Sequence, residues 1–159
     1  MNAAVLTVSD RASRGEAADS SGDLLEELLR ADGHEVVRRT VPDEAAEIAT
    51  AIEELAAGAS LVLTTGGTGL APRDVTPEAT RSVLQREAPG IAEALRTDSI
   101  AKTPHGLLSR GVAGTIGGAL VVNLPGSTGG CRDGYALLRP AIGHAVALLS
   151  DRPTAHTQT

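Results

Sequence analysis

Residues 35–65 read EVVRRTVPDEAAEIATAIEELAAGASLVLTT, and this stretch predicts the fold class. It contains a strand pattern over residues 35–41, an alanine-rich amphipathic helix over 44–58 and an apolar strand over 60–65. A helix between two strands joins them as parallel neighbours through a right-handed crossover. The stretch therefore predicts an α/β protein whose sheet is covered by helices on both faces.

The same strand-and-helix unit appears toward the N-terminus. Residues 3–9 (AAVLTVS) form a short apolar run that predicts a buried strand, and a polar segment over 10–22 predicts a flexible loop. Residues 21–34 (SGDLLEELLRADGH) place four leucines on one helical face, with Gly33 where a C-cap glycine is expected. The first 65 residues therefore predict three parallel strands and two helices.

The C-terminal half continues with helices and then changes the type of connection. Helical patterns cover residues 76–87, with Thr76 as N-cap and Pro77 as first helical residue, and 90–103, followed by a short turn at 105–111. Two further strand patterns, 112–116 and 119–125, are separated only by two glycines. Since that is too short for a crossover, we expect an antiparallel hairpin over 112–125.

The expected architecture is therefore a three-layer α/β/α sandwich, with a mostly parallel sheet and one antiparallel strand from the 112–125 hairpin. A last helix, roughly residues 131–150, completes a single predicted domain over 1–150, and residues 151–159 are expected to be a flexible tail.

Composition limits the class of protein. Fourteen basic and 20 acidic residues give a net charge of −6, which argues against a general nucleic-acid binder. The lone Cys131 excludes an internal disulfide and suits a reducing compartment. The N-terminus lacks a leader pattern, and no apolar run approaches the roughly 18 residues of a membrane span. We expect a cytoplasmic protein that binds neither nucleic acid nor membrane.

The candidate site lies where the parallel strands end, because ligands of such sheets bind at the carboxyl edge. The loops expected there cover residues 7–11, 41–45, 64–69 and 123–130. These loops and the segment after residue 69 carry three aspartates, Asp10, Asp43 and Asp74, and two loops combine glycine with Ser or Thr. Such loops cradle phosphates through backbone and hydroxyl donors, while aspartates hold Mg²⁺ or orient a reacting group.

Each feature also has a structural interpretation. Three glycines at 66, 67 and 69 could form a tight turn, Asp43 could be a turn former or helix N-cap, and Arg73 with Asp74 could be a surface ion pair. Neither glycine loop is a Walker loop or a dinucleotide fingerprint. No serine-hydrolase elbow is present, and no His or Cys spacing is typical of a structural zinc site.

The motifs taken together resemble the molybdenum-cofactor biosynthesis family, which includes the MogA and MoaB proteins and the gephyrin G domain. The resemblance is carried, in chain order, by TVSDR (7–11), VPDE (41–44), TTGGTGLAPRDVTPEAT (64–80), LSRG (108–111) and NLPGSTGG (123–130). It implies a Mg²⁺-dependent molybdopterin adenylyltransferase that uses ATP and molybdopterin as substrates. It also implies a homotrimer, or a hexamer, and a downstream partner that inserts molybdate.

The resemblance assigns the catalytic and Mg²⁺-binding roles to Asp43 and Asp74. Glycines at 66–69 would let backbone approach phosphate, and Thr65, Thr68 and Thr76 would add hydroxyl donors. The expected substrate- and nucleotide-binding residues are Ser9, Asp10, Thr65, Gly66, Gly67, Thr68, Gly69, Arg73, Thr76, Ser109, Arg110, Pro125, Gly126 and Ser127.

One departure and two alternatives accompany this prediction. Many relatives carry a lysine soon after the PGS motif, whereas this chain has Gly129 and Gly130 there, with Arg132 as the nearest cation. A catalytically silent MoaB-type pterin carrier would bind pterin without turning over ATP. A nucleotide pyrophosphatase of the competence-damage type would hydrolyse a dinucleotide-like substrate without molybdopterin.

Overall fold

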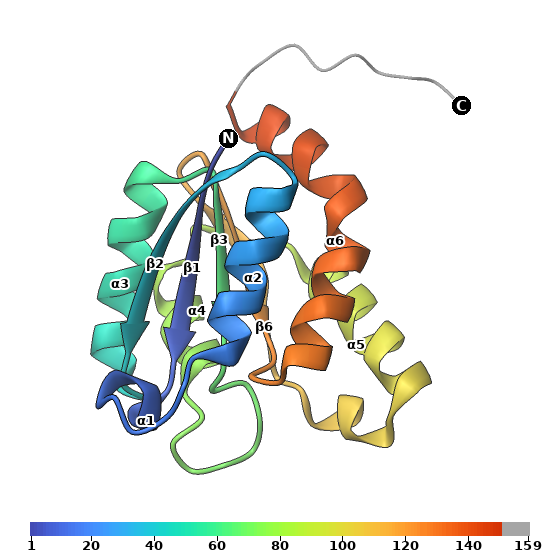
Figure 1. The fold of residues 1–159 in the computed structure, drawn as a ribbon. Helices are drawn as coiled ribbons and strands as arrows, with labels where there is room; N and C mark the ends of the chain where they lie inside the picture. Colours follow the sequence, from blue (N-terminus) through green and yellow to red (C-terminus); the bar gives the residue numbers. More distant parts are fainter. Residues whose placement is uncertain (151–159) are drawn as a thin grey trace.

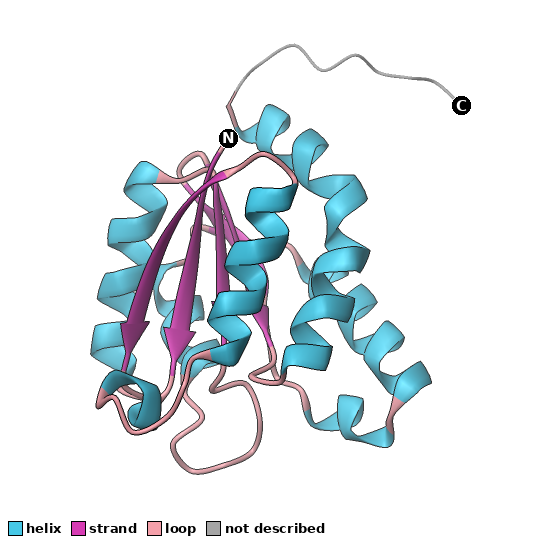
Figure 2. Cartoon of the chain, viewed as in Figure 1, coloured by secondary structure: helices cyan, strands magenta, loops and turns pink. Residues whose placement is uncertain are grey.

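Six strands form one sheet in the order β2-β1-β3-β6-β5-β4, as the computed structural model of residues 1–150 shows (Figures 1 and 2). The predicted tail over 151–159 lies outside the described residues. The strands are β1 (Asn2–Val8), β2 (Glu35–Val41), β3 (Leu61–Thr65), β4 (Arg86–Glu87), β5 (Ala113–Ile116) and β6 (Ala119–Leu124).

Strand directions confirm the predicted hairpin. β1 runs parallel to β2 and β3, and β3 runs parallel to β6. β5 is antiparallel to both of its neighbours, β6 and β4, so it is the one strand of the sheet that opposes the rest. Gly117, with a φ of 54°, allows the tight connection between β5 and β6.

Helices cover both faces of the sheet, as predicted. α3 and α4 pack on one face, while α2, α5 and α6 pack on the other (Figure 1). The helices are α1 (Asp10–Ser13), α2 (Ser20–Ala31), α3 (Ala45–Gly58), α4 (Thr76–Val83), α5 (Pro89–Lys102), the 3₁₀ helix η1 (Pro104–Leu108) and α6 (Thr128–Leu149).

Alternating strand residues fill two separate cores. Val5 of β1 packs with Leu25 and Leu29 of α2, whereas Leu6 packs with Ile48 and Ile52 of α3 on the opposite face. All of these side chains are fully buried, and burying one such side chain contributes roughly 1.5–3 kcal/mol. Because both faces are apolar, the central strands are continuously hydrophobic, which fixes them in the interior of the sheet.

The predicted helix over 76–87 is shorter than expected. α4 ends at Val83, and the chain turns extended at Leu84 so that Gln85 N–H donates to Thr115 O (2.9 Å). Residues 86–87 then pair with β5, where Gly114 lacks the Cβ that would collide with Arg86 O. Pairing with a sheet edge therefore overrides a helical pattern that continues in the sequence.

Two local predictions also need correction. Val75, not Thr76, is the N-cap of α4, because the buried Thr76 Oγ1 donates to Gly66 O (2.9 Å). The polar segment after β1 is not all loop, since Ser9 Oγ accepts from Ala12 N–H (3.1 Å) and begins the short helix α1. Gly33 lies just after α2 with a φ of 80°, as predicted for the residue that follows the C-cap.

Candidate functional site

The loops after β1, β2, β3 and β6 meet at the carboxyl edge of the sheet; in Figure 1, β1 and β2 end there beside α1 and β6 ends beside the start of α6. Ser9 N–H donates to Val41 O (3.0 Å), which joins the first two loops. Gly66, at a φ of 97°, packs directly on Val8 O, so a Cβ there would collide with that carbonyl. Gly66 N–H also donates to Leu124 O (3.3 Å), which brings the β6 loop into the same edge.

The loops leave a crevice along this edge, which we describe as two ends. One end is a pocket of about 700 Å³, and we call it the pocket end. Several of the predicted binding residues line it: Gly67, Thr68, Gly69, Asp74, Ser109, Pro125, Gly126 and Ser127.

The opposite wall of the pocket comes from α5, η1 and the start of α6, which the sequence did not indicate. Its residues include Leu95, Arg96, Asp98, Ser99, Lys102, His105 and Asp133. The sequence carries no motif for this wall, because α5 reads only as a mixed, weakly amphipathic helix. Lys102 bridges Asp98 (2.7 Å) and Asp133 (3.1 Å), and so ties α5 to α6 beside Gly129 and Gly130.

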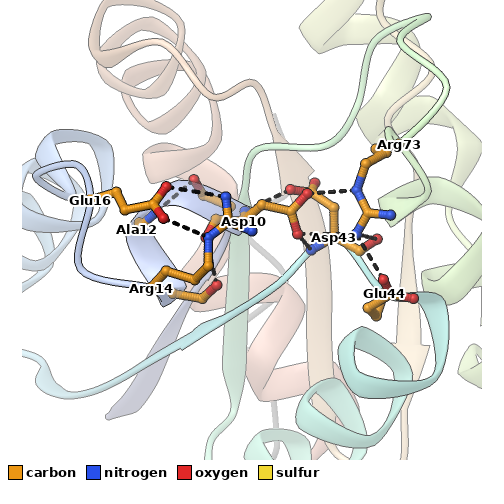
Figure 3. A network of polar contacts seen from close by, with 9 residues as sticks. Asp10, Ala12, Arg14, Glu16, Asp43, Glu44 and Arg73 are labelled. Atoms are coloured by element: carbon orange, nitrogen blue, oxygen red, sulfur yellow. Dashed lines mark hydrogen bonds and ion pairs between the residues drawn. The ribbon is translucent and has the colours of Figure 1, made fainter.

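The second half of the crevice, the charged end, is built on Asp10, Asp43, Glu44 and Arg73 (Figure 3). Asp10 and Asp43 exchange hydrogen bonds: Asp10 N–H donates to Asp43 Oδ2 (2.8 Å), and Asp43 N–H donates to Asp10 Oδ1 (3.0 Å). Each aspartate thereby fixes the carboxylate of the other, and the β1 and β2 loops are locked in register.

Arg73 completes the charged end from the β3–α4 loop. Its Nε donates to Asp10 Oδ2 (2.6 Å) and its Nη2 to Asp10 Oδ1 (3.1 Å), while Nη2 also reaches Glu44 Oε1 (2.8 Å). The suggested pair between Arg73 and Asp74 does not form. Asp74 instead accepts a bond from Ala71 N–H at Oδ2 (3.0 Å), which closes a turn of its own loop.

The two bonded aspartates have opposite electrostatic environments. The Arg73 guanidinium, with the backbone N–H of Asp43, holds the pKa of Asp10 below its usual value. Burial raises the pKa of Asp43, and the nearby charges of Asp10 and Asp74 raise it further. A cation bound at this site would therefore stabilise the charged form of Asp43 more than that of Asp10.

Arg110 holds the β3–α4 loop from the other side. Its Nε donates to Gly69 O (2.7 Å), its Nη2 donates to Asp74 O (2.7 Å), and its Nη1 pairs with Glu78. Arg110 N–H also donates to Thr68 O (2.9 Å). Arg110, which we expected to bind substrate, thus uses its donors on protein groups and braces the loop.

The hydroxyls of Thr65 and Thr76 are not the open donors we expected. Thr65 Oγ1 donates to Pro125 O (2.9 Å) and Thr76 Oγ1 donates to Gly66 O, and both residues are buried. Of the three threonines, only Thr68 lines the pocket. Ser9 and Ser127 use Oγ to accept helix N–H groups, from Ala12 and Gly130, which leaves each O–H to donate.

The two aspartates assigned to Mg²⁺ each keep one oxygen available. Within residues 1–150, protein donors reach Oδ2 of Asp43 and Oδ2 of Asp74, and Oδ1 of each is left for another partner. Asp43 Oδ1 lies beside Gly67, 3.2 Å from where a Cβ would stand. No cluster of three metal-ligating side chains occurs in this part of the chain. Two carboxylates without such a cage fit Mg²⁺, which is commonly held by one or two carboxylates, water and substrate phosphates.

Comparisons with family models, curated sequences and solved structures all point to the same family. Residues 4–144 match the family model described as "Probable molybdopterin binding domain". The chain is 39% identical over 150 residues to the molybdopterin adenylyltransferase of Helicobacter pylori (strain J99), covering 91% of this chain and 85% of that protein. The structure resembles the molybdopterin biosynthesis enzyme MoaB from Thermus thermophilus, with a TM-score of 0.88, 45% identity, and coverage of 96% and 98% of the two chains.

Other relatives are much longer than this chain. Gephyrin of Dictyostelium discoideum is 38% identical over 161 residues, which cover 94% of this chain but only 22% of gephyrin. This chain spans less than half the length of several curated relatives that it matches. None of the helices within residues 1–150 combines the length and apolar character that a membrane span requires.

Proposed function

This chain belongs to the molybdopterin-binding domain family, and from that premise we propose that it is a molybdopterin adenylyltransferase of molybdenum cofactor biosynthesis. The enzyme would transfer AMP from ATP to the terminal phosphate of molybdopterin and release pyrophosphate. A phosphate oxygen of molybdopterin forms a bond to the α-phosphorus of ATP, and the bond from that phosphorus to the oxygen it shares with the β-phosphorus breaks, so that this oxygen leaves on pyrophosphate. The proposal is supported by the relative from Helicobacter pylori that bears this name, because its similarity covers 91% of this chain.

The two ends of the crevice fit the two kinds of group in such a reaction. The pocket end offers about 700 Å³, enough for an organic ring system, between the loop at 67–69 and helix α5. The adjoining charged end offers the carboxylate of Asp43, and Asp74 and the glycine loop at 67–69 line the pocket where the two ends meet. Phosphates bound between the two ends would bring the reacting oxygen toward the α-phosphorus, and alignment supplies much of the catalysis in phosphoryl-type transfer.

Asp43 and Asp74 would hold Mg²⁺ through their available Oδ1 atoms. The ion, when bound, neutralises the phosphate charge that builds up on the departing pyrophosphate. The chain's own contribution is to keep the two carboxylates fixed and to keep Asp43 partly buried, which strengthens its attraction to a cation. The observation that carries the proposal is this pair of carboxylates, each with one oxygen available, at the carboxyl edge of a sheet of this family.

The decisive experiment incubates purified protein anaerobically with molybdopterin, Mg²⁺ and α-labelled ATP, beside the Asp74→Asn variant. We expect label on the pterin with the unmutated protein and none with the variant, while both still bind pterin. Pterin binding without label transfer by the unmutated protein would identify a silent carrier. Release of labelled AMP without molybdopterin would identify a pyrophosphatase.

Three further properties are proposed with the function. Removal of Mg²⁺ with EDTA should abolish transfer, and added Mg²⁺ should restore it. Light scattering at micromolar concentration should give the mass of a trimer, with a hexamer as the other expected assembly, and a monomer would contradict this. The product would pass to a molybdate-inserting partner in the cytoplasm, a reducing compartment in which the Cys131 thiol remains reduced.

A further inference from the structure

Both carboxylate oxygens of Asp10 are bonded to protein donors, although its side chain is 21% exposed at the crevice. Oδ1 accepts from Asp43 N–H (3.0 Å) and Arg73 Nη2 (3.1 Å), and Oδ2 accepts from Arg73 Nε (2.6 Å). A carboxylate with both oxygens held by a forked guanidinium has little left to offer to a phosphate or a cation. Asp10 therefore serves the protein rather than a ligand.

What Asp10 and Arg73 hold is Asp43. The backbone N–H of Asp10 fixes Asp43 Oδ2 (2.8 Å), and Arg73 Nη2 donates to the backbone carbonyl of Asp43 (3.2 Å). With its own N–H bonded to Asp10, Asp43 is held through three of its polar groups. Its remaining carboxylate oxygen, Oδ1, is thereby aimed at Gly67 and the phosphate-binding loop.

The same arginine also fixes the position of Asp74, the next residue in the chain. Asp74 itself is bonded to Ala71 of its own loop, through its N–H and its Oδ2, and to Arg110 through its carbonyl oxygen. The anchor that binds this loop to the β1 and β2 loops is Arg73, which spans 63 residues to Asp10 and 29 to Glu44. Figure 3 shows Arg73 reaching across to Asp10 and Glu44.

We propose that Asp10 and Arg73 form a positioning pair that sets the distance and orientation between Asp43 and Asp74. The proposal rests on the adenylyltransferase function proposed above, because it assigns these two residues to alignment of that site. The pair links three loops from separate strands, so breaking it would let the two catalytic carboxylates move relative to each other.

The effect should appear in turnover and not in stability. The Arg73 side chain is 56% exposed and that of Glu44 55%, and exposed ion pairs contribute little to folding. The reaction rate is more sensitive than stability to the loss of this pair, since a displacement of about 1 Å at a reacting centre can lower the rate about 100-fold.

The test compares Arg73→Gln and Asp10→Asn with the control Arg39→Gln. Arg39 lies on β2, is 40% exposed and pairs with Glu54, so it matches Arg73 in type and exposure without touching an aspartate of the site. We expect kcat to fall about 10- to 100-fold in each test variant, with KM for molybdopterin within about twofold and the melting temperature within about 3 °C. Arg39→Gln should keep the activity of the unmutated protein.

Two further variants distinguish positioning from substrate binding. Arg73→Lys should recover only part of kcat, because an ammonium cannot form the two-point fork. The double variant Asp10→Asn with Arg73→Gln should lose no more than the worse single variant, since both break one unit. A rise in KM with unchanged kcat, or losses that multiply in the double variant, would overturn the proposal.

A measurement without turnover separates this proposal from the function on which it rests. Hydrogen exchange by NMR should show faster exchange of the Asp10 and Asp43 amides in Arg73→Gln, and no change in Arg39→Gln. If the unmutated protein fails to transfer label, the proposed function fails, but faster exchange still supports the positioning role. Unchanged exchange of both amides in Arg73→Gln would overturn the positioning role whatever the activity.

Discussion

The charged end and the pocket end of the crevice share one glycine-rich loop but are built in opposite ways. At the charged end, Asp10, Asp43 and Arg73 bond one another across three loops, and little freedom is left. At the pocket end, the loop at 67–69, α5, η1 and the start of α6 surround about 700 Å³, lined by glycines and half-exposed polar side chains. The difference indicates that one end is built to fix charge and the other to admit a bulky group.

Glycine has a different purpose in the shared loop and in the first turn of α6. Gly67 has a φ of 66°, and a Cβ there would collide with Thr76 Oγ1, so the loop shared by the two ends needs glycine for its backbone path. Gly129 lies in the first turn of α6 with open space around it. Gly129 therefore leaves room for a ligand at the pocket end and meets no demand of the backbone.

The largest expected effect comes from removing the charge of Asp43. Asp43→Asn should lower adenylyl transfer by at least about 100-fold, because it removes a preorganised carboxylate from the site. Its melting temperature at pH 7 should not fall, since burial raises the pKa of Asp43 and the charged form is unfavourable in the folded protein. Transfer assays and thermal unfolding measure the two results.

The matched control for that variant is Asp23→Asn on α2, whose side chain is 68% exposed and pairs with Arg38 away from the crevice. It should keep full activity. If Asp43→Asn were destabilised, or if it kept normal activity, the charge of Asp43 would serve the structure and not the reaction, contrary to this prediction.

A second prediction compares the two glycines directly. Gly67→Ala should lower the free energy of unfolding by about 2–3 kcal/mol, because alanine is strained at positive φ and the added methyl meets Thr76. Gly129→Ala should leave stability unchanged or raise it by up to about 1 kcal/mol, as alanine favours the helix. Urea unfolding of both variants measures the difference, and equal losses would show that the shared loop and the first turn of α6 constrain the backbone alike.

A smaller loss is expected when the loop between the two ends loses its brace. Arg110→Gln removes donors to Gly69 O and Asp74 O, and we expect it to lower the free energy of unfolding by about 1–2 kcal/mol. The control is Arg30→Gln, whose partner Glu26 lies on the same helix, α2. Faster amide exchange around residues 69–74 should accompany the loss in Arg110→Gln alone, and its absence would argue against the brace.

The smallest effect is a pH dependence of opposite sign at the two bonded aspartates. The pKa of Asp10 is lowered on folding, so its contribution is present above the unfolded pKa of about 3.9 and is lost as pH falls through the folded value. The pKa of Asp43 is raised, so the folded protein gains stability as pH falls from neutral toward about 4.

Urea unfolding between about pH 3 and pH 7 in EDTA measures both slopes. The stability of the unmutated protein relative to Asp10→Asn should fall with falling pH, while its stability relative to Asp43→Asn should rise. Slopes of the same sign for the two variants would show that the aspartates share one environment.

Much of the fold could be predicted because its signals are local. The 35–41 and 60–65 strand patterns correspond to β2 and β3 to within one residue, and two glycines between strand patterns were enough to predict the hairpin. Strand ends follow from strand positions, so the loops that carry Asp43 and Asp74 could also be placed at one edge of the sheet.

What could not be predicted depends on contacts between distant segments. Adjacency in sequence suggested Asp74 as the partner of Arg73, but the observed partner, Asp10, lies 63 residues away. The α5 wall of the pocket exists only because η1 packs on α5, where Gly106 approaches the backbone of Ile100 too closely for a Cβ. β4 likewise depends on a neighbour, β5, that comes later in the chain.

The order of the strands has a consequence for how this protein folds. β3 pairs with β6 in the register Leu61 with Leu120, so the central ladder closes a loop of nearly 60 residues. Pairings of such long range form slowly, because chain entropy is lost before the contacts compensate for it. The loops of β1, β2 and β3 can meet early, but the last side of the crevice arrives only with β6. We therefore expect ligand binding to be acquired late in refolding, after most of the helical signal has returned.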